Sequence, residues 1–214
     1  VLLAMLMLIL LSVLIPARAE EAVSPMIVSE TAGSTEYPAL ESDIPVITSE
    51  GKSNVKIAGV KSKNKLVRYT IPETLLRADE NFLALMVEAE KYIGYPYVYG
   101  GSKPSTGFDC SGFVCWVFRQ SGIYDTGRLG AKGLYSLCTD VSRDEARPGD
   151  LVFFTKTMGA DVKGITHVGI YVGNDMMLHA GDPVGFADLQ SDKWAKKIYA
   201  FGRLPVQQGA QANE

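Results

Sequence analysis

The sequence predicts an α+β fold in which helices precede an antiparallel β-sheet. Apolar residues with helical spacing come first, between about residues 80 and 120, and short runs of strand-forming residues follow them. Separation of helices and strands along the chain is typical of α+β domains. With 214 residues, 47% of them hydrophobic, the chain is long enough for one well-packed domain and an extension.

Two helices are expected. The apolar residues of the first follow helical spacing: Phe82, Leu85, Met86, Ala89 and Ile93. Asp79 or Asn81 can cap its start, and Gly94 can terminate it. The second helix runs from Cys110 to about residue 120, where Gly122 stops it. Between the two helices, the run Y-P-Y-V-Y-G-G is extended and aromatic.

Four strands are expected after the second helix, at residues 151–154, 167–172, 176–180 and 198–202. The second and third form a β-hairpin, because the sequence G-N-D at 173–175 supplies turn chemistry. If the loop consists of these three residues, Gly169 faces His179, and His167 lies diagonally across on the same face, ~7–8 Å away. A loop of two residues would place the two histidines on opposite faces.

The start of the chain has the character of a targeting segment. Residues 1–15 are almost entirely apolar, and P-A-R-A follows them. A short apolar run before an A-x-A pattern predicts a secretory signal that is cleaved after Ala19. If apolar residues precede Val1, the segment would instead span a membrane. Because an initiator Met and a basic start are missing, we expect residues 1–19 to be a signal peptide or membrane anchor that is truncated at its N-terminus.

Residues 20–74 are predicted to form a disordered linker. Residues 20–50 hold seven acidic and no basic side chains, and residues 51–71 hold six basic and no acidic ones. Neither stretch has a convincing apolar periodicity. A solvated tether is favoured over contact of the basic block with an anionic wall polymer. The ordered domain is expected at residues 75–205, followed by a disordered tail at 206–214.

Charge and composition limit the partners of the protein. A net charge of −3 gives no basic footprint for nucleic acid. We therefore expect no nucleic-acid partner. We also expect the protein to be a monomer, with membrane anchoring only through residues 1–15.

Cys110 is the candidate nucleophile. A thiol attacks only as the thiolate, and the free N–H groups and dipole of a helix N-terminus favour that anion. Phe113, Val114 and Val117 would pin the first turn of this helix to the core. Asp109 opposes the thiolate through its own charge, and it either caps the helix or binds a substrate amine. Taken alone, Cys110 would be a packed core cysteine.

The two other cysteines are not expected to take part in chemistry. Cys115 lies five residues after Cys110, about 140° around an ideal helix, so the two do not form a metal pair. Cys115 and Cys138 either pair or are small buried residues, and burial is favoured. With three cysteines, an exported protein keeps at least one free thiol.

His167 and His179 are the only histidines of the chain. A cysteine near a helix start with two histidines on later strands is the set that a thiol hydrolase needs, since no other imidazole is available as a base. The alternatives are two unrelated histidines, or an open zinc site made of both histidines and one cysteine. No H-x-x-x-H or C-x-x-C motif and no obvious carboxylate partner supports a metal, so we expect no metal and no organic cofactor.

Five sequence blocks occur in a fixed order: P-Y-V-Y-G-G at 96–101, D-C-S-G-F at 109–113, R-P-G-D-L-V-F-F at 147–154, T-H-V-G-I-Y-V-G at 166–173 and L-H-A-G at 178–181. They resemble the NlpC-type family (NlpC/p-sixty), papain-like cysteine peptidases of the bacterial cell wall. The resemblance extends from about Phe82 to Leu204. The helix F-V-C-W-V-F and the closing Y-A-F-G-R-L resemble, more weakly, members carried on conjugative elements of Gram-positive bacteria.

The resemblance implies a papain-like fold and a triad of Cys110, His167 and His179. His167 would take the proton of Cys110, and His179 would hold the ring of His167 in the useful tautomer. The chain is therefore predicted to be an exported peptidoglycan endopeptidase, secreted to the wall or anchored facing outwards. The resemblance further implies cleavage of the stem peptide between D-γ-glutamate and the diamino acid. An N-acetylmuramoyl-L-alanine amidase or acyltransferase, and an inactive wall-binding module, are the alternatives.

Three further residues acquire a role through the resemblance. It implies that the hydroxyl of Tyr97 approaches the thiol, where it would assist backbone N–H groups in stabilising an oxyanion. Family members commonly use the Asp and Ser that flank the cysteine near the amino group of the substrate. Asp109 and Ser111 match those two positions.

Overall fold

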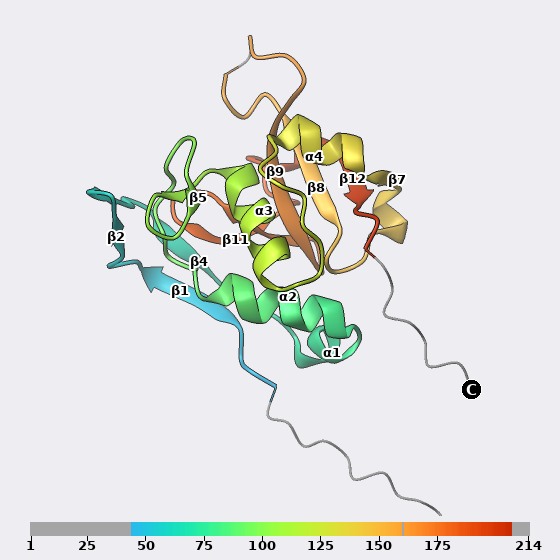
Figure 1. Ribbon diagram of the computed structural model, residues 1–214, viewed down its shortest axis with the longest axis horizontal. Helices are drawn as coiled ribbons and strands as arrows, with labels where there is room; N and C mark the ends of the chain where they lie inside the picture. The colour runs from blue at the N-terminus through green and yellow to red at the C-terminus, as the bar shows by residue number, and fades with distance from the viewer. Residues whose placement is uncertain (1–43, 160, 207–214) are drawn as a thin grey trace, which may run out of the picture. The chain divides into compact units, whose positions relative to one another are not determined.

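The structure, a computed structural model, describes residues 44–159 and 161–206. Its centre is a six-stranded antiparallel sheet with the strand order β11-β10-β9-β8-β12-β7 (Figure 1). The strands are β7 (Thr139–Val141), β8 (Leu151–Thr155), β9 (Ile165–Gly173), β10 (Met176–Ala180), β11 (Val184–Asp188) and β12 (Ile198–Arg203). The predicted α+β class is confirmed.

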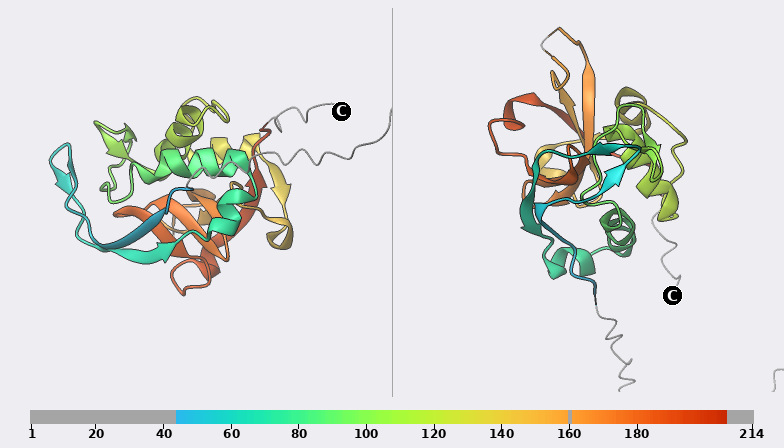
Figure 2. Two further views of the ribbon diagram at one scale, coloured as in Figure 1. Left: turned by 90° about the horizontal axis from the view of Figure 1, so that it is seen from below. Right: turned by 90° about the vertical axis from the view of Figure 1, so that its left-hand side faces the viewer.

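Helices and short elements complete the domain. They are α1 (Glu73–Arg77), α2 (Glu80–Glu90), α3 (Cys110–Gln120) and α4 (Ala131–Leu137), two 3₁₀ turns (Arg143–Glu145 and Ala195–Lys197) and the short strands β5 (Ser102–Lys103) and β6 (Gly107–Phe108). Helix α3 packs against β9, β10 and α2, and Figure 2 shows α2, α3 and α4 on one side of the sheet. The helix that begins with Cys110 is therefore central to the domain.

Local signals placed the two long helices correctly. Asp79, rather than Asn81, caps α2, because its carboxylate accepts a hydrogen bond from the backbone N–H of Phe82 at 3.0 Å. Helix α2 ends at Glu90, before Gly94, whose φ is +91°. Helix α3 occupies the predicted range and stops just before Gly122, whose φ is +76°. The four predicted strands are all present, whereas α1, α4, β7 and β11 were not predicted.

The sheet is buried on both faces, and this determines where the histidines point. Leu151 and Phe153 of β8 pack into the core that the helices cover. The alternate residues Val152 and Phe154 pack into a second apolar cluster that includes Trp194. Because side chains alternate along a strand, each strand contributes to two separate layers. The imidazole of His167 contacts Phe154 and Trp194 and so belongs to the second layer.

The prediction of a disordered linker over 20–74 is wrong for the part that the structure describes. Four strands lie in this segment: β1 (Thr48–Lys52), β2 (Lys56–Ile57), β3 (Val60–Lys61) and β4 (Lys65–Thr70). Strand β1 pairs with β4, β2 pairs with β3, and β4 packs against β11 (Figure 1). The ordered unit thus includes residues before the predicted boundary at 75.

The linker prediction failed because composition does not report docking onto another element. The segment has no convincing apolar periodicity, but Ile47 and Ile71, near the two ends of its described part, are almost completely buried. The backbone N–H of Ile71 donates to the carbonyl of Ile47, at 3.0 Å. The ring of Tyr69 meets Phe186 of β11 edge to face, with centroids 5.0 Å apart. These few contacts hold a polar hairpin against an existing sheet.

This correction predicts a large difference between two adjacent substitutions. Ile47→Ala should lower the free energy of unfolding by about 2–5 kcal/mol, because it removes a fully buried side chain. Val46→Ala should change it by less than about 0.5 kcal/mol, because that side chain is 71% exposed. Urea unfolding of the two variants measures both values. Equal and small effects would show that this segment does not contribute to the fold.

Several predictions lie outside the described residues. They are the signal peptide or anchor at 1–19, the part of the linker at 20–43 and the tail at 207–214. Within the part of the chain that the structure describes, no helix has the length and apolar character needed to cross a membrane.

Candidate active site

Cys110 is the first residue of α3, and Asp109 is its N-cap. One carboxylate oxygen of Asp109 accepts from the backbone N–H of Gly112 at 2.6 Å, as a helix cap does. Phe113 and Val114 are fully buried, so the first turn is pinned to the core as predicted. Cys110 itself is 8% exposed, and the backbone N–H of Val168 in β9 points at its sulfur. The thiol therefore lies beside the strand that carries His167.

Burial dominates the electrostatics of the thiol. Burial, and then the charge of Asp109, raise the pKa of Cys110 above its usual value. The backbone N–H groups of Val168, Ser111 and Cys110 itself act in the opposite direction without overcoming it. The expected field of the helix start is present, but the resting thiol is protonated at neutral pH. It needs a base in contact with it to become a nucleophile.

The hairpin brings the two histidines together, but its loop length and strand pairing differ from the prediction. Its loop has two residues, Asn174 and Asp175, both with positive φ, and Gly173 pairs with Met176. The predicted three-residue loop is therefore wrong. A β-bulge then shifts the pairing so that Met177 faces Tyr171, which is the register that the three-residue loop would have given.

The bulge decides the geometry of the imidazole pair. A two-residue loop alone would send the histidines to opposite faces, and one extra residue in β9 returns them to the same face. The Nε2 atom of His167 lies 2.8 Å from Nδ1 of His179, so the predicted proximity is confirmed. Gly169 allows the close packing of β10 beside His179, since a Cβ there would lie 2.8 Å from Sδ of Met177 and 3.1 Å from the Cβ of His179.

Both imidazoles are neutral at pH 7. Burial, and then the charge of Lys193, lower the pKa of His167 from 6.5 to about 3, and burial lowers the pKa of His179 well below 6.5. A single proton then lies in the bond between the rings. If Nε2 of His167 donates it to Nδ1 of His179, the Nδ1 atom of His167 keeps a free lone pair that can accept a proton.

Trp194 covers the imidazole pair and was not among the predicted site residues. Its ring stacks on His167 with centroids 5.2 Å apart and planes at 24°, and it meets His179 edge to face at 5.0 Å. Lys193 places its Nζ atom 5.0 Å from the centre of the same indole. A large aromatic residue within the polar run S-D-K-W-A-K-K was the available signal.

Tyr97 lies near the thiol of Cys110, whose charge acts on its phenol. An isolated bridge joins it to Phe108, which fixes the extended segment before α3. Its phenol is half-buried, and burial, followed by the charges of Cys110 and Asp109, raises the pKa of Tyr97. The hydroxyl is therefore a protonated donor near the thiol at neutral pH.

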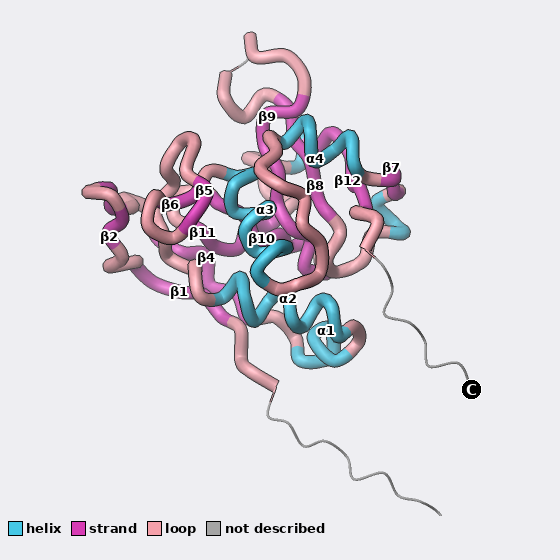
Figure 3. Tube along the Cα trace, viewed as in Figure 1, coloured by secondary structure: helices cyan, strands magenta, loops and turns pink. Residues whose placement is uncertain are grey.

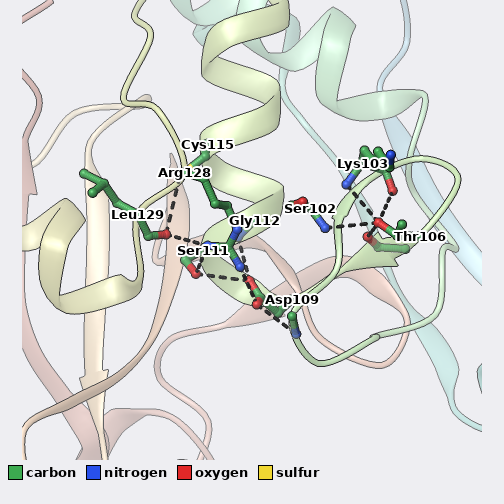
Figure 4. A network of polar contacts seen from close by, with 11 residues as sticks. Ser102, Lys103, Thr106, Asp109, Ser111, Gly112, Cys115, Arg128 and Leu129 are labelled. Atoms are coloured by element: carbon green, nitrogen blue, oxygen red, sulfur yellow. Dashed lines mark hydrogen bonds and ion pairs between the residues drawn. The ribbon is translucent and has the colours of Figure 1, made fainter.

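Asp109 and Ser111 form a network with Arg128, a residue that the sequence analysis did not single out. Arg128 comes from the long connection between α3 and α4 (Figure 3). One guanidinium nitrogen lies 2.6 Å from a carboxylate oxygen of Asp109, and the other donates to the hydroxyl of Ser111 at 3.0 Å (Figure 4). The structure thus brings both predicted substrate-binding residues together, but with an arginine bound to them.

The sequence profile of the NlpC/P60 family matches residues 94–203, just over half of the chain. The chain belongs to the NlpC/P60 family. The matched segment contains every residue of the site, from Tyr97 to Trp194. The fold is the papain-like arrangement of this family, with the cysteine at the start of a helix that packs on an antiparallel sheet.

Individual NlpC/P60 relatives are clearly similar over this domain. The bifunctional muramidase/DL-endopeptidase CwlT of Bacillus subtilis is 46% identical over 121 residues, which cover 56% of this chain and 36% of that protein. A gamma-DL-glutamyl hydrolase of the same organism is 42% identical over 120 residues, 55% of this chain and 28% of that protein.

A solved NlpC/P60 structure from Staphylococcus aureus, described as similar to lipoprotein, has a TM-score of 0.55 and 41% identity. The similarity covers 59% of this chain and 42% of that one. The chain therefore matches less than half of the length of each of these three relatives.

The remaining thiols of this NlpC/P60 domain are unsuited to chemistry. All three cysteines, which lie within the described residues, are free. Cys115 is buried, and its sulfur lies 3.6 Å from the carbonyl oxygen of Leu129. Burial, and then the charges of Asp150 and Asp140, raise the pKa of Cys138 to about 12. Among the described residues, no group of three or more His, Cys, Asp or Glu side chains is arranged to hold a metal ion.

Trp194 should affect turnover more than binding. Trp194→Ala frees the ring of His167, and a poorly placed base is expected to lower kcat about 10- to 100-fold with little change in KM. Trp194→Phe should recover most of this loss. Phe201→Ala is the matched control, since Phe201 lies in the same apolar layer and should lower the melting temperature while preserving kcat. If Trp194→Ala changes only the melting temperature, the indole has no role beyond packing.

Proposed function

We propose that this chain is a peptidoglycan hydrolase, a cysteine endopeptidase that cleaves an amide bond of the stem peptide. The observation that carries the proposal is the position of Cys110 at the start of α3, beside the strand of His167, with His167 bonded to His179 at 2.8 Å. A thiol, a neutral imidazole base and a second imidazole that orients the first are the parts of a nucleophilic acyl-transfer site.

The chemistry follows from the protonation states. In the described residues the hydrogen bond of the His167 side chain is with His179, and none joins it to the thiol of Cys110. Since the thiol and the imidazoles rest in their neutral forms, we assign to His167 the role of accepting the Cys110 proton at Nδ1, once bound substrate brings the two groups into contact and the sulfur attacks the carbonyl carbon. The bond between His167 and His179 then stabilises the imidazolium that forms. His167 gives the proton to the leaving amine, the C–N bond breaks, and a thioester remains on Cys110. Water hydrolyses the thioester and regenerates the thiol.

The developing oxyanion needs donors that are fixed before the reaction. The backbone N–H groups at the start of α3 are oriented by the cap of Asp109, and the phenol of Tyr97 stays protonated. We assign both to the stabilisation of the oxyanion. Donors held by the fold require no reorganisation when the charge appears, which is why they lower the barrier.

Similarity to named relatives supports a particular bond. One relative is called a DL-endopeptidase and another a gamma-DL-glutamyl hydrolase, and both match the part of the chain that contains the site. We therefore assign cleavage to the bond between D-γ-glutamate and the diamino acid. Because peptidoglycan lies outside the membrane, we also assign the protein to the wall or the outer membrane surface, reached through residues 1–19.

Mass spectrometry of a muropeptide digest tests the proposed function. The full chain should release L-Ala–D-Glu from stem peptides or leave muramoyl-L-Ala–D-Glu on the glycan, according to the state of the stem. Intact stems released from the glycan would show an N-acetylmuramoyl-L-alanine amidase, and new peptide bonds would show an acyltransferase. Binding to the wall without any new product, at several pH values, would show an inactive wall-binding module.

A further inference from the structure

The carboxylate of Asp109 has no free acceptor position. Two oxygens of a carboxylate offer about four acceptor sites. One oxygen accepts from the N–H of Gly112 at 2.6 Å and the hydroxyl of Ser111 at 3.1 Å. The other accepts from the N–H of Gly100 at 3.1 Å and the guanidinium of Arg128 at 2.6 Å. A substrate ammonium would have to displace one of these donors.

Arg128 also neutralises the charge that would attract an ammonium. Its side chain forms an ion pair with Asp109, whose side chain is 11% exposed. The same guanidinium donates to Ser111, so both residues that match the amine-binding positions are occupied by one cation. A second cation at this place would be repelled by the first, and displacing the arginine would leave the largely buried carboxylate of Asp109 without its counter-charge.

The charged side chains that line the pocket beside Arg128 are basic. This pocket has a volume of about 280 Å³, and its charged lining residues are Lys103, Arg119 and Arg128. Arg119 lies 3.9 Å from Asp125, so part of this charge is compensated. The side chain of Arg128 is 40% exposed, so a ligand can reach it. The charges of Cys110 and Asp109 raise the pKa of Tyr97, and the charge of Arg128 acts in the opposite direction. The arginine therefore lies close to the start of α3, where Asp109 and Ser111 flank Cys110.

We infer that Arg128 determines the substrate specificity of the subsite next to Cys110. This subsite accepts an uncharged, N-acylated residue and disfavours a residue with a free α-amine. The inference rests on the proposed endopeptidase function and deepens it. A stem peptide that is still attached to the glycan carries its first residue as an amide, without a charge. The substrate class is then the stem in intact peptidoglycan, rather than the stem peptide already released from muramic acid.

Two soluble peptides test this inference. One is L-Ala-γ-D-Glu-diaminopimelate with a free α-amine, and the other is its N-acetyl derivative, which differs only in that charge. The full chain should hydrolyse the acetylated peptide with a kcat/KM at least about 10-fold higher. This comparison needs no variant, so it does not depend on how a substitution affects folding.

Substitution of Arg128 is the second test of the inference. Arg128→Met removes the cation with little change in length, exposes the charge of Asp109, and should shift the preference about 10-fold or more towards the free amine. Arg128→Lys keeps the charge and should keep the preference for the acetylated peptide. Arg143→Met is the matched control, because Arg143 forms a similar 2.6 Å ion pair, with Asp175 in the hairpin turn, at similar exposure.

The outcomes separate the inference from the function. A wild-type preference for the free amine, or an equal loss on both peptides in Arg128→Met, overturns the inference and leaves the endopeptidase function standing. No cleavage of either peptide by the wild-type chain overturns the function, and the inference with it.

Discussion

Cys110→Ala is expected to abolish hydrolysis of peptidoglycan while the domain remains folded. Loss of the nucleophile from an acyl-transfer site lowers kcat by up to about 10⁶-fold, because only binding and oxyanion stabilisation remain. The substitution removes one sulfur atom from a side chain that is 8% exposed, so we expect a modest fall in the melting temperature, similar to that of Cys115→Ala, and no loss of the fold. Release of muropeptide products over time, with circular dichroism as a check on folding, measures both effects.

The two other thiols are the controls for this prediction. Cys115→Ala and Cys138→Ala should keep full turnover, and Cys115→Ala should cost about 1–3 kcal/mol of stability because its sulfur is buried. Iodoacetamide should label Cys110 before Cys138, whose pKa is raised to about 12. If Cys110→Ala turned over substrate at the wild-type rate, the proposed mechanism would be wrong.

The parts of the fold that the sequence predicted are those with local signals. Helices α2 and α3 have apolar periodicity, an aspartate cap and a following glycine, and the main strands have runs of branched and aromatic residues. Helix α4 has Gly133 in its middle and no side-chain cap. Strand β11 begins directly after Pro183 and contains Gly185. Such elements form because neighbouring elements bury them, which a local pattern does not reveal.

The residues of the site also divide into those that the sequence predicted and those that it did not. Cys110, His167 and His179 were found because rare, reactive residue types stood in a recognisable order. Trp194 and Arg128 were missed because their contacts are made entirely by tertiary structure: one stacks on residues of two strands, and the other reaches back from a loop to a helix cap. The β-bulge in the hairpin was missed for a similar reason. Its effect is visible only when the pairing of both strands is known.

His167 and His179 should not be equivalent, although they share one hydrogen bond. His167→Ala removes the imidazole that we propose as the base for the thiol, and we expect activity to fall almost to that of Cys110→Ala. His179→Gln keeps an acceptor, since the amide oxygen can receive the Nε2–H of His167, and should retain a measurable fraction of kcat. His179→Ala leaves that buried N–H unpaired and should lose more activity than His179→Gln.

The pH profile tests the same assignment from another direction. A base is active when unprotonated, and the pKa of His167 is lowered from 6.5 to about 3. The acid limb of kcat/KM should therefore lie well below pH 6.5, and activity should not fall as the pH decreases from 7 to 6. His179→Gln should shift the pH at which this acid limb occurs, because the substitution changes the group that is hydrogen-bonded to His167. An acid limb at 6.5 in the wild type, unchanged in His179→Gln, would mean that a solvent-exposed group and not this buried pair supplies the base. Equal inactivity of His179→Gln and His167→Ala would instead show that His179 takes part in proton transfer rather than orienting its partner.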